Sequence, residues 1–245
     1  MENKKKMIFN VLFLFLVFAA TLYGVFHGED LSEIAEILKT VNLYWLLPGV
    51  ACVIIFIWGE SIIIFYMMHT LGIHLKKWKC FLFSSVGFFF SCITPSASGG
   101  QPMQIYYMKK EKISIPVSTV ILMIVTITYK LVLVVIGIGI AIFGRGFLHK
   151  YLEGILPVFY LGLMLNIFCV TFMTILVFHP LLAKAILMKG MKLLERFHLM
   201  RKKEGRLKKL EASMDTYRNT AAYLKNNSLV IVKVIGITFI QRMAL

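Results

Sequence analysis

Charged side chains are scarce in this sequence. They make up 16% of the 245 residues, and only 12 of them are Asp or Glu, whereas about a quarter is usual in soluble domains. The chain is 59% hydrophobic with a mean hydropathy of +0.80. Several apolar runs approach or exceed the roughly 20 residues that cross a ~30 Å hydrocarbon core, and they are continuous rather than alternating. These features exclude an ordinary soluble domain and a membrane β-barrel, and they predict an all-α polytopic integral membrane bundle.

Sequence motifs for common active-site chemistry are also missing. The cysteines form no CxxC pair, and the histidines show no metal-ligand spacing such as HExxH. There is no P-loop, no nucleophile elbow and no dinucleotide fingerprint. The sequence therefore predicts no metal site, no cofactor and no catalytic residue. We interpret the four cysteines as small apolar residues: Cys52, Cys80, Cys92 and Cys169.

Basic residues outnumber acidic ones, and the formal net charge is +15. In a soluble protein this charge would suggest nucleic acid. Here the cations lie between apolar segments, where Lys and Arg mark cytoplasmic loops. We therefore expect no nucleic-acid partner, and we use the charges to assign topology.

The order of the charges places the N-terminus in the cytoplasm. Lys4, Lys5 and Lys6 precede an apolar run at 7–26, which is too long for a usual signal core and is read as an uncleaved helix. The acidic loop 27–42 suits the outside. The expected apolar segments are 7–26, 43–68, 81–93, 117–143, 155–178 and 229–245.

The segment 81–93 is too short to cross the membrane, since 13 helical residues span about 20 Å. If it crossed, the region 181–228, with 12 Lys and Arg against 4 acids, would lie outside and violate the charge rule. We therefore predict a re-entrant hairpin over 81–108 and a basic cytoplasmic insert at 181–228. This insert is expected to be a helical hairpin that turns near 200–205. Apolar residues of its second helix recur every three or four positions and form a stripe: Leu207, Leu210, Met214, Tyr217, Ala221 and Leu224. The hairpin either packs on the protein or holds anionic lipid headgroups.

The tip of the predicted hairpin is the stretch TPSASGGQP at 94–102. Pro95 should end the first half-helix, and Gly99 and Gly100 allow positive φ and close backbone approach. A second half-helix beginning near residue 101 would point its free N–H groups into the membrane, which suits a phosphate. The predicted lipid-phosphate site is Ser96, Ser98, Gly99, Gly100 and Gln101; a purely structural kink is the alternative.

Two ionisable residues, Glu60 and Lys130, lie within the apolar segments 43–68 and 117–143. Intramembrane charges are costly and usually face a cavity or a partner. We predict that Glu60 pairs with Lys130, or that Lys130 neutralises a bound headgroup. The alternative is that Glu60 lies near an interface and has no such role.

The stretch ITPSASGGQPMQIYYMKK resembles the membrane portion of bacterial lysylphosphatidylglycerol synthases (the multiple peptide resistance factor) and related flippase-like proteins. A Pro-Ser-x-x-Gly-Gly-x-Pro pattern carries the resemblance, here Pro95, Ser96, Gly99, Gly100 and Pro102. The resemblance implies a single flippase-like domain over 1–245 that lacks the family's last helices. It also implies that the family's lysyl-transferring cytosolic domain is absent, so the chain is not expected to catalyse phosphatidylglycerol lysyl transfer by itself.

The function that the resemblance implies is the handling of anionic or lysyl-modified phospholipid, with a contribution to resistance against cationic antimicrobial peptides. The alternatives are a membrane-bound lipid transferase and a membrane scaffold that docks through the basic insert. The expected partners are phospholipid and the membrane, and a homo-oligomer is left open. The expected location is the bacterial plasma membrane.

Overall fold

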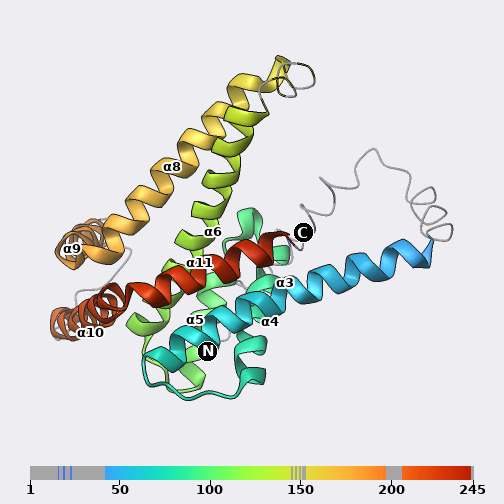
Figure 1. Ribbon diagram of the computed structural model, residues 1–245. Coiled ribbons are helices and arrows are strands. Elements are labelled where there is room, and N and C mark those ends of the chain that lie inside the picture. Colours follow the sequence, from blue (N-terminus) through green and yellow to red (C-terminus); the bar gives the residue numbers. More distant parts are fainter. Residues whose placement is uncertain are drawn as a thin grey trace.

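The computed structural model describes residues 42–144, 153–196 and 206–243, with the single residues Leu16, Ala19, Tyr23, Gly146, Leu148 and Lys150. Within these residues the chain is helical and contains no strand, which confirms the all-α prediction (Figure 1). The predicted first span at 7–26 lies outside the described ranges. The elements are α3 (Leu43–Thr70), α4 (Lys77–Ile93), η1 (Pro95–Ala97), α5 (Gly100–Lys110), α6 (Ile115–Phe143), η2 (Glu153–Ile155), α8 (Leu156–Phe178), α9 (Pro180–Arg196), α10 (Arg206–Asn226) and α11 (Ser228–Met243).

Three helices of the described ranges are long and apolar enough to cross a membrane by themselves. They cover Tyr44–Thr70, Ile115–Phe143 and Leu156–Phe178, with 27, 29 and 23 residues. Helix α11 has 16 residues and qualifies only together with α10, from which it is bent by 82°. The described part of the chain therefore offers three candidate spans, or four if the bent pair is one.

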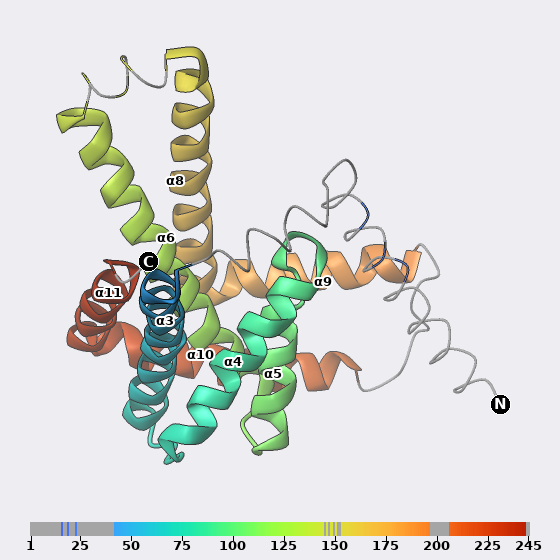
Figure 2. The same cartoon turned by 90° about the vertical axis from the view of Figure 1, so that its right-hand side faces the viewer.

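Helices α4 and α5 form an antiparallel hairpin. Figure 2 shows them side by side, with the η1 turn at one end and their other ends together at the opposite end. Helix α4 ends where predicted, because Thr94 adopts extended backbone (φ −117°, ψ 143°) before Pro95. The Thr94 hydroxyl accepts a hydrogen bond from the Gly99 N–H at 2.9 Å and so closes the turn.

Two glycines let the arms of the hairpin touch. A Cβ on Gly100 would lie 2.1 Å from the Ser91 hydroxyl oxygen and 2.7 Å from the Gly87 carbonyl oxygen. A Cβ on Gly87 would lie 2.3 Å from the Gln104 side-chain nitrogen. All three distances are below the range that real Cβ contacts show, so glycine at both positions permits this packing.

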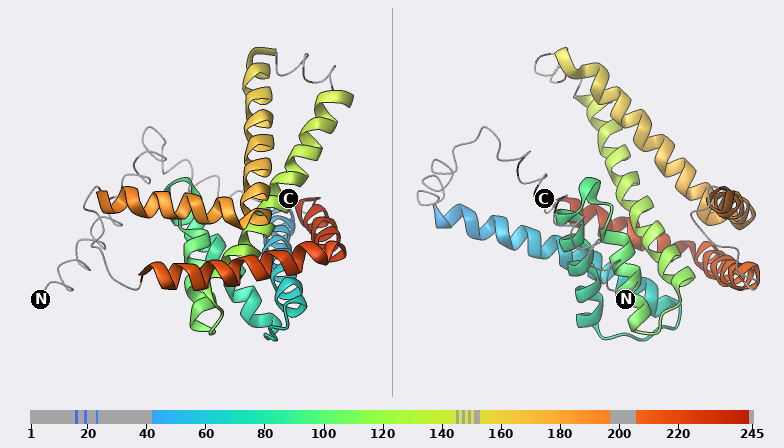
Figure 3. Two further views of the ribbon diagram at one scale, coloured as in Figure 1. Left: turned by 90° about the vertical axis from the view of Figure 1, so that its left-hand side faces the viewer. Right: turned by 180° about the vertical axis from the view of Figure 1, so that it is seen from behind.

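The apolar core lies where the hairpin meets α3, α6, α10 and α11. Its fully buried side chains come from each of these elements: Ile63, Ile64, Phe83, Met108, Ile121, Leu224 and Val234. Helix α11 crosses beside α3 (Figure 1). The α8 helix and the second half of α6 extend away from the other helices as a pair (Figure 1 and Figure 3).

The region predicted as a basic insert contains helices α9 and α10. The predicted apolar stripe on the second helix is buried at Met214, Tyr217, Ala221 and Leu224. Tyr217 also donates a hydrogen bond to the Leu176 carbonyl oxygen at 3.1 Å. These contacts favour the packing alternative for this face of α10. The predicted turn at 200–205 lies outside the described residues.

Candidate functional site

A cavity of about 310 Å³, lined by apolar and polar side chains, lies beside the tip of the α4–α5 hairpin. Helices α3, α4, α5, α6 and α11 all contribute to its lining. Apolar side chains such as Phe56, Phe88 and Leu122 form part of the wall. The polar side chains that line it are Glu60, Ser91, Gln101, Gln104, Thr126, Tyr129 and Arg242.

Glu60 is held in this cavity by the second arm of the hairpin. Its carboxyl oxygen accepts a hydrogen bond from the Gln104 side-chain amide at 2.7 Å. Gln104 is only 4% exposed and occupies the space that a side chain on Gly87 would fill. The hairpin glycine therefore makes room for the amide that positions the carboxyl group.

Arg242 supplies the opposite charge. Its guanidinium carbon lies 3.5 Å from the ring centroid of Tyr129 and 4.6 Å from that of Phe56, so the cation lies between two aromatic rings. Its Nε atom is buried and has no hydrogen-bond partner. Glu60 and Arg242 line the same cavity, yet the described residues show no ion pair between them. The cavity thus presents a carboxyl group and a guanidinium as separate groups.

Helix α11 is anchored so that Arg242 enters the cavity. The Gln241 side-chain amide donates to the Phe56 carbonyl oxygen at 2.7 Å, and Gly59 lies under the same side chain. One turn earlier, the Thr238 hydroxyl donates to the Thr128 hydroxyl at 3.3 Å. These contacts fix α11 against both α3 and α6.

The backbone of the hairpin tip differs from the prediction. Positive φ occurs at Ser96 (53°) and Ala97 (55°), while Gly99 has φ −82° and Gly100 is helical. The expectation that the two glycines supply positive φ is therefore wrong. Their other predicted role, close backbone approach, is the one that the structure shows for Gly100.

Helix α5 begins at Gly100, one residue before the predicted start, and its first turn faces the cavity. Within the described ranges, the backbone N–H groups of Gly100 and Gln101 donate no hydrogen bond, and Pro102 has none to donate. The Gln101 side chain donates to the Thr126 hydroxyl at 2.6 Å. Free amides at a helix start are suited to an anion.

The predicted phosphate-site residues divide into two groups. Gly100 and Gln101 line the cavity. Ser96 and Ser98 are exposed and Gly99 is half-buried, and none of these three lines it. The Ser98 hydroxyl instead donates to the Pro95 carbonyl oxygen at 2.9 Å, within the turn.

Lys130 does not reach the cavity, and the predicted pair with Glu60 does not form. Its ammonium group donates instead to the Asn166 side-chain oxygen on α8 at 3.4 Å. The physical reason is helical phase: adjacent residues point about 100° apart, so when Tyr129 faces the cavity Lys130 faces α8.

Arg242 and Gln104 are the site residues that sequence reasoning missed. A signal existed for Arg242, since the apolar segment at 229–245 contains an arginine and intramembrane cations are functional candidates. No local pattern singled out Gln104, because its place beside Glu60 depends on the packing of α5 against α3.

A family model described as Lysylphosphatidylglycerol synthase TM region matches residues 7–244. The chain belongs to this family. The comparisons with curated proteins and with solved structures gave no match. The family and the three long apolar helices together make this a multi-pass membrane protein with a lipid-related function.

Proposed function

We propose that this protein is a flippase-like carrier that moves anionic or lysyl-modified phospholipid between membrane leaflets. The headgroup would pass through the cavity at the tip of the α4–α5 hairpin. The observation that supports this proposal is the pairing of a guanidinium with free backbone amides in one cavity. Moving the lysyl-modified lipid, whose headgroup carries a net positive charge, to the outer leaflet would reduce the attraction of cationic antimicrobial peptides to the cell.

The phosphate end of the headgroup would bind between α5 and α11. Arg242 lines the cavity and has a buried Nε without a hydrogen-bond partner, and Gly100 and Gln101 have two unused N–H groups. A phosphate accepts hydrogen bonds from both kinds of donor, and charge-assisted bonds are about twice as strong as neutral ones. This arrangement gives the predicted phosphate site a cation from α11 in place of Lys130.

The amine end of a lysylated headgroup would lie near Glu60. Gln104 donates to one carboxyl oxygen of Glu60 at 2.7 Å, which leaves the remaining lone pairs to accept from an ammonium. A headgroup with only a phosphate would leave this part of the cavity to water or a sugar hydroxyl.

The hairpin is proposed to be re-entrant, in a plasma membrane with the N-terminus in the cytoplasm. Helix α5 has 11 residues, too few for a full crossing, and α4 has 17, at the lower limit for one. The irregular backbone at 94–99 would then lie at membrane depth, where it is tolerated only when it lines a cavity or is buried. Ala97 lines the cavity, while the exposed Ser96 and Ser98 would need water or another part of the protein against them.

Proteoliposomes with fluorescent phosphatidylglycerol and fluorescent lysyl-phosphatidylglycerol would test the proposal. The readout is the lipid fraction exposed to a membrane-impermeant quencher over time. We expect the protein to accelerate exchange of one or both lipids, and Arg242→Met to slow it at least tenfold. Lys130→Met is the matched control, since it removes an equal intramembrane charge outside the cavity and should change the rate less than twofold.

Two results would overturn the proposal. One is a rate of exchange no faster than in protein-free liposomes. The other is equal slowing by Arg242→Met and Lys130→Met, which would show that any lost charge acts through the fold rather than through the cavity.

A further inference from the structure

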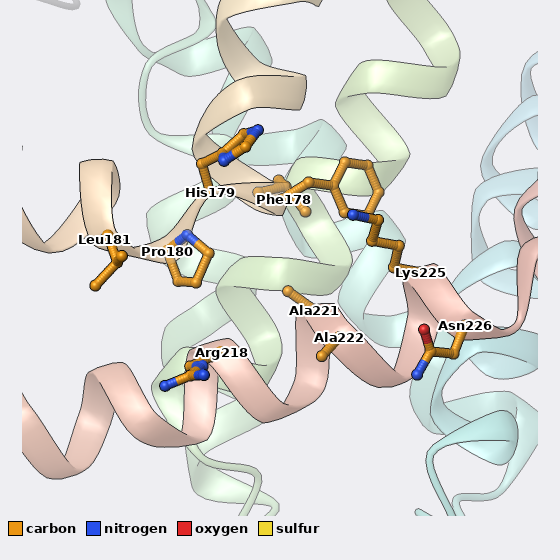
Figure 4. A pocket seen from close by; sticks show the side chains of 10 residues that line it. Phe178, His179, Pro180, Leu181, Arg218, Ala221, Ala222, Lys225 and Asn226 are labelled. Atoms are coloured by element: carbon orange, nitrogen blue, oxygen red, sulfur yellow. The ribbon is translucent and has the colours of Figure 1, made fainter.

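A second cavity, of about 460 Å³, lies where α8 ends and α9 begins, opposite α10. Figure 4 shows His179 and Pro180 from the α8–α9 junction on one side, and Arg218, Ala222 and Lys225 from α10 on the other. It shares no lining residue with the cavity at the hairpin tip. The proposed transport function assigns no role to it.

The charged side chains of this second cavity are all potential cations. Arg218, Lys225 and His179 line it, and no Asp or Glu does. In the described ranges none of the three makes an ion pair or donates a hydrogen bond from its side chain. One turn away, Lys184 is paired with Glu211 at 3.2 Å, so carboxylates are present nearby but do not neutralise the cavity.

Contacts on two sides fix the walls of the cavity. The Tyr217 hydroxyl donates to the Leu176 carbonyl oxygen at 3.1 Å, which ties α10 to the end of α8. The Lys184–Glu211 pair ties α9 to α10. Val177 and Ala221 between them are buried, with exposed fractions of 0% and 2%. The three helices therefore hold the basic side chains around a defined space.

The floor and position of the cavity favour a lipid. Phe178, Leu181 and Ala222 give it apolar walls beside the cations. It also lies at the end of the candidate span Leu156–Phe178, which is the level at which headgroups meet the first acyl carbons. A soluble polyanion such as RNA would gain from the cations but not from the apolar wall.

We propose that this cavity binds the phosphate headgroup of an anionic phospholipid of the surrounding bilayer, at a site separate from the transport cavity. Arg218 and Lys225 would hold the phosphate, and the unused backbone N–H of Leu181 at the start of α9 would add a donor. The first part of the acyl chains would lie against Phe178. The site would keep one lipid on the protein through purification.

Native mass spectrometry of the full chain tests this proposal. The protein would be released from micelles that contain phosphatidylglycerol and phosphatidylcholine of equal chain length. We expect one retained phosphatidylglycerol, and a double variant Arg218→Gln/Lys225→Gln should need at least tenfold more of this lipid for the same occupancy. Ala222→Glu, which places a carboxylate in the cavity, should have the same effect.

The control is Lys109→Gln/Lys112→Gln, which removes two exposed cations that do not line this cavity. It should leave retention within twofold of the unchanged protein. A thermal unfolding curve checks that each variant is folded. The proteoliposome assay on Arg218→Gln/Lys225→Gln separates this site from the transport proposal, because lipid exchange should continue in this variant while lipid retention is lost.

Three outcomes would overturn the inference. The first is equal loss of lipid in the cavity variant and in the control, which would indicate general surface charge. The second is equal retention of phosphatidylcholine. The third is displacement of the lipid by millimolar inorganic phosphate or by short RNA at a lower concentration than by phosphatidylglycerol, which would assign the cavity to a soluble anion.

Discussion

Two regions of this molecule place polar groups on apolar helices in different ways. Around the hairpin tip, Glu60, Gln104 and Arg242 come from three helices and line one cavity. Along the pair formed by α6 and α8, Lys130 and Asn166 make one hydrogen bond of 3.4 Å. The first region gathers polar side chains from several helices around one cavity. The second region shows a single side-chain hydrogen bond between two helices.

Glycine packing shows the same difference. At the hairpin, Gly59, Gly87 and Gly100 lie so close to neighbouring atoms that a Cβ would come within 3 Å of them. Along α6 and α8, Gly139 and Gly162 have nothing within 4 Å of the Cβ position, while a Cβ on Gly137 would lie 2.9 Å from the Leu163 side chain. The window of α8 that could span a membrane is only 6% buried within the described chain. Close glycine packing is thus more extensive around the cavity than along α6 and α8.

The largest expected effect on stability tests this packing difference directly. Gly100→Ala places a methyl group 2.7 Å from the Gly87 carbonyl oxygen, and the backbone cannot move away without separating α4 from α5. We expect the free energy of unfolding to fall by about 1–3 kcal/mol. Gly139→Ala, in open space within a helix, should raise it by about 0.5–1 kcal/mol.

Both free energies can be measured by titrating the purified protein with a denaturing detergent and following helicity. The prediction concerns the sign as well as the size. If Gly100→Ala stabilises the protein as much as Gly139→Ala does, the hairpin is not closely packed. The packing of α4 on α5 then cannot be what shapes the cavity beside it.

The sequence was informative about the hairpin because the residues that end α4 and start α5 act on their immediate neighbours in the chain. Pro95 ends α4 through a steric rule that involves only its neighbour, and α5 starts within one residue of the predicted position. The predicted helical character and the burial of the stripe on α10 follow from composition and period. Each of these features depends on residues close together in the chain.

The cavity could not be predicted in full because it depends on residues far apart in the chain. Arg242 reaches Tyr129 only after α11 folds back across α3 and α6. The pair of Glu60 and Lys130 was predicted because both lie within long apolar runs, but the phase of α6 turns Lys130 toward α8. The positive φ at Ser96 and Ala97 was missed for a similar reason, since a turn held by Thr94 overrides the local preference for glycine.

A smaller effect is expected for the contact that holds Glu60. A double-mutant cycle of Glu60→Leu and Gln104→Leu should give a coupling free energy of about 1–2 kcal/mol, within the range of side chains in direct contact. The Gln104 side-chain nitrogen lies 2.7 Å from a Glu60 carboxyl oxygen, and Gln104 is buried. The control is the pair Glu60→Leu and Asn166→Leu, one from each region. Their changes in the free energy of unfolding should be additive. A coupling near zero for the first pair would mean that Gln104 does not position the carboxyl group.

The smallest effect is expected at the other region. A cycle of Lys130→Met and Asn166→Leu should give a coupling of about 0.6 kcal/mol or less, the average for hydrogen bonds between helices in a membrane. Two observations argue for a low value. The donor–acceptor distance is 3.4 Å, beyond the usual range for N–H···O bonds, and the Asn166 amide already donates to the Gly162 carbonyl oxygen of its own helix at 3.0 Å. A coupling above that of Glu60 and Gln104 would reverse the comparison, because it would make the α6–α8 contact the better-organised polar site.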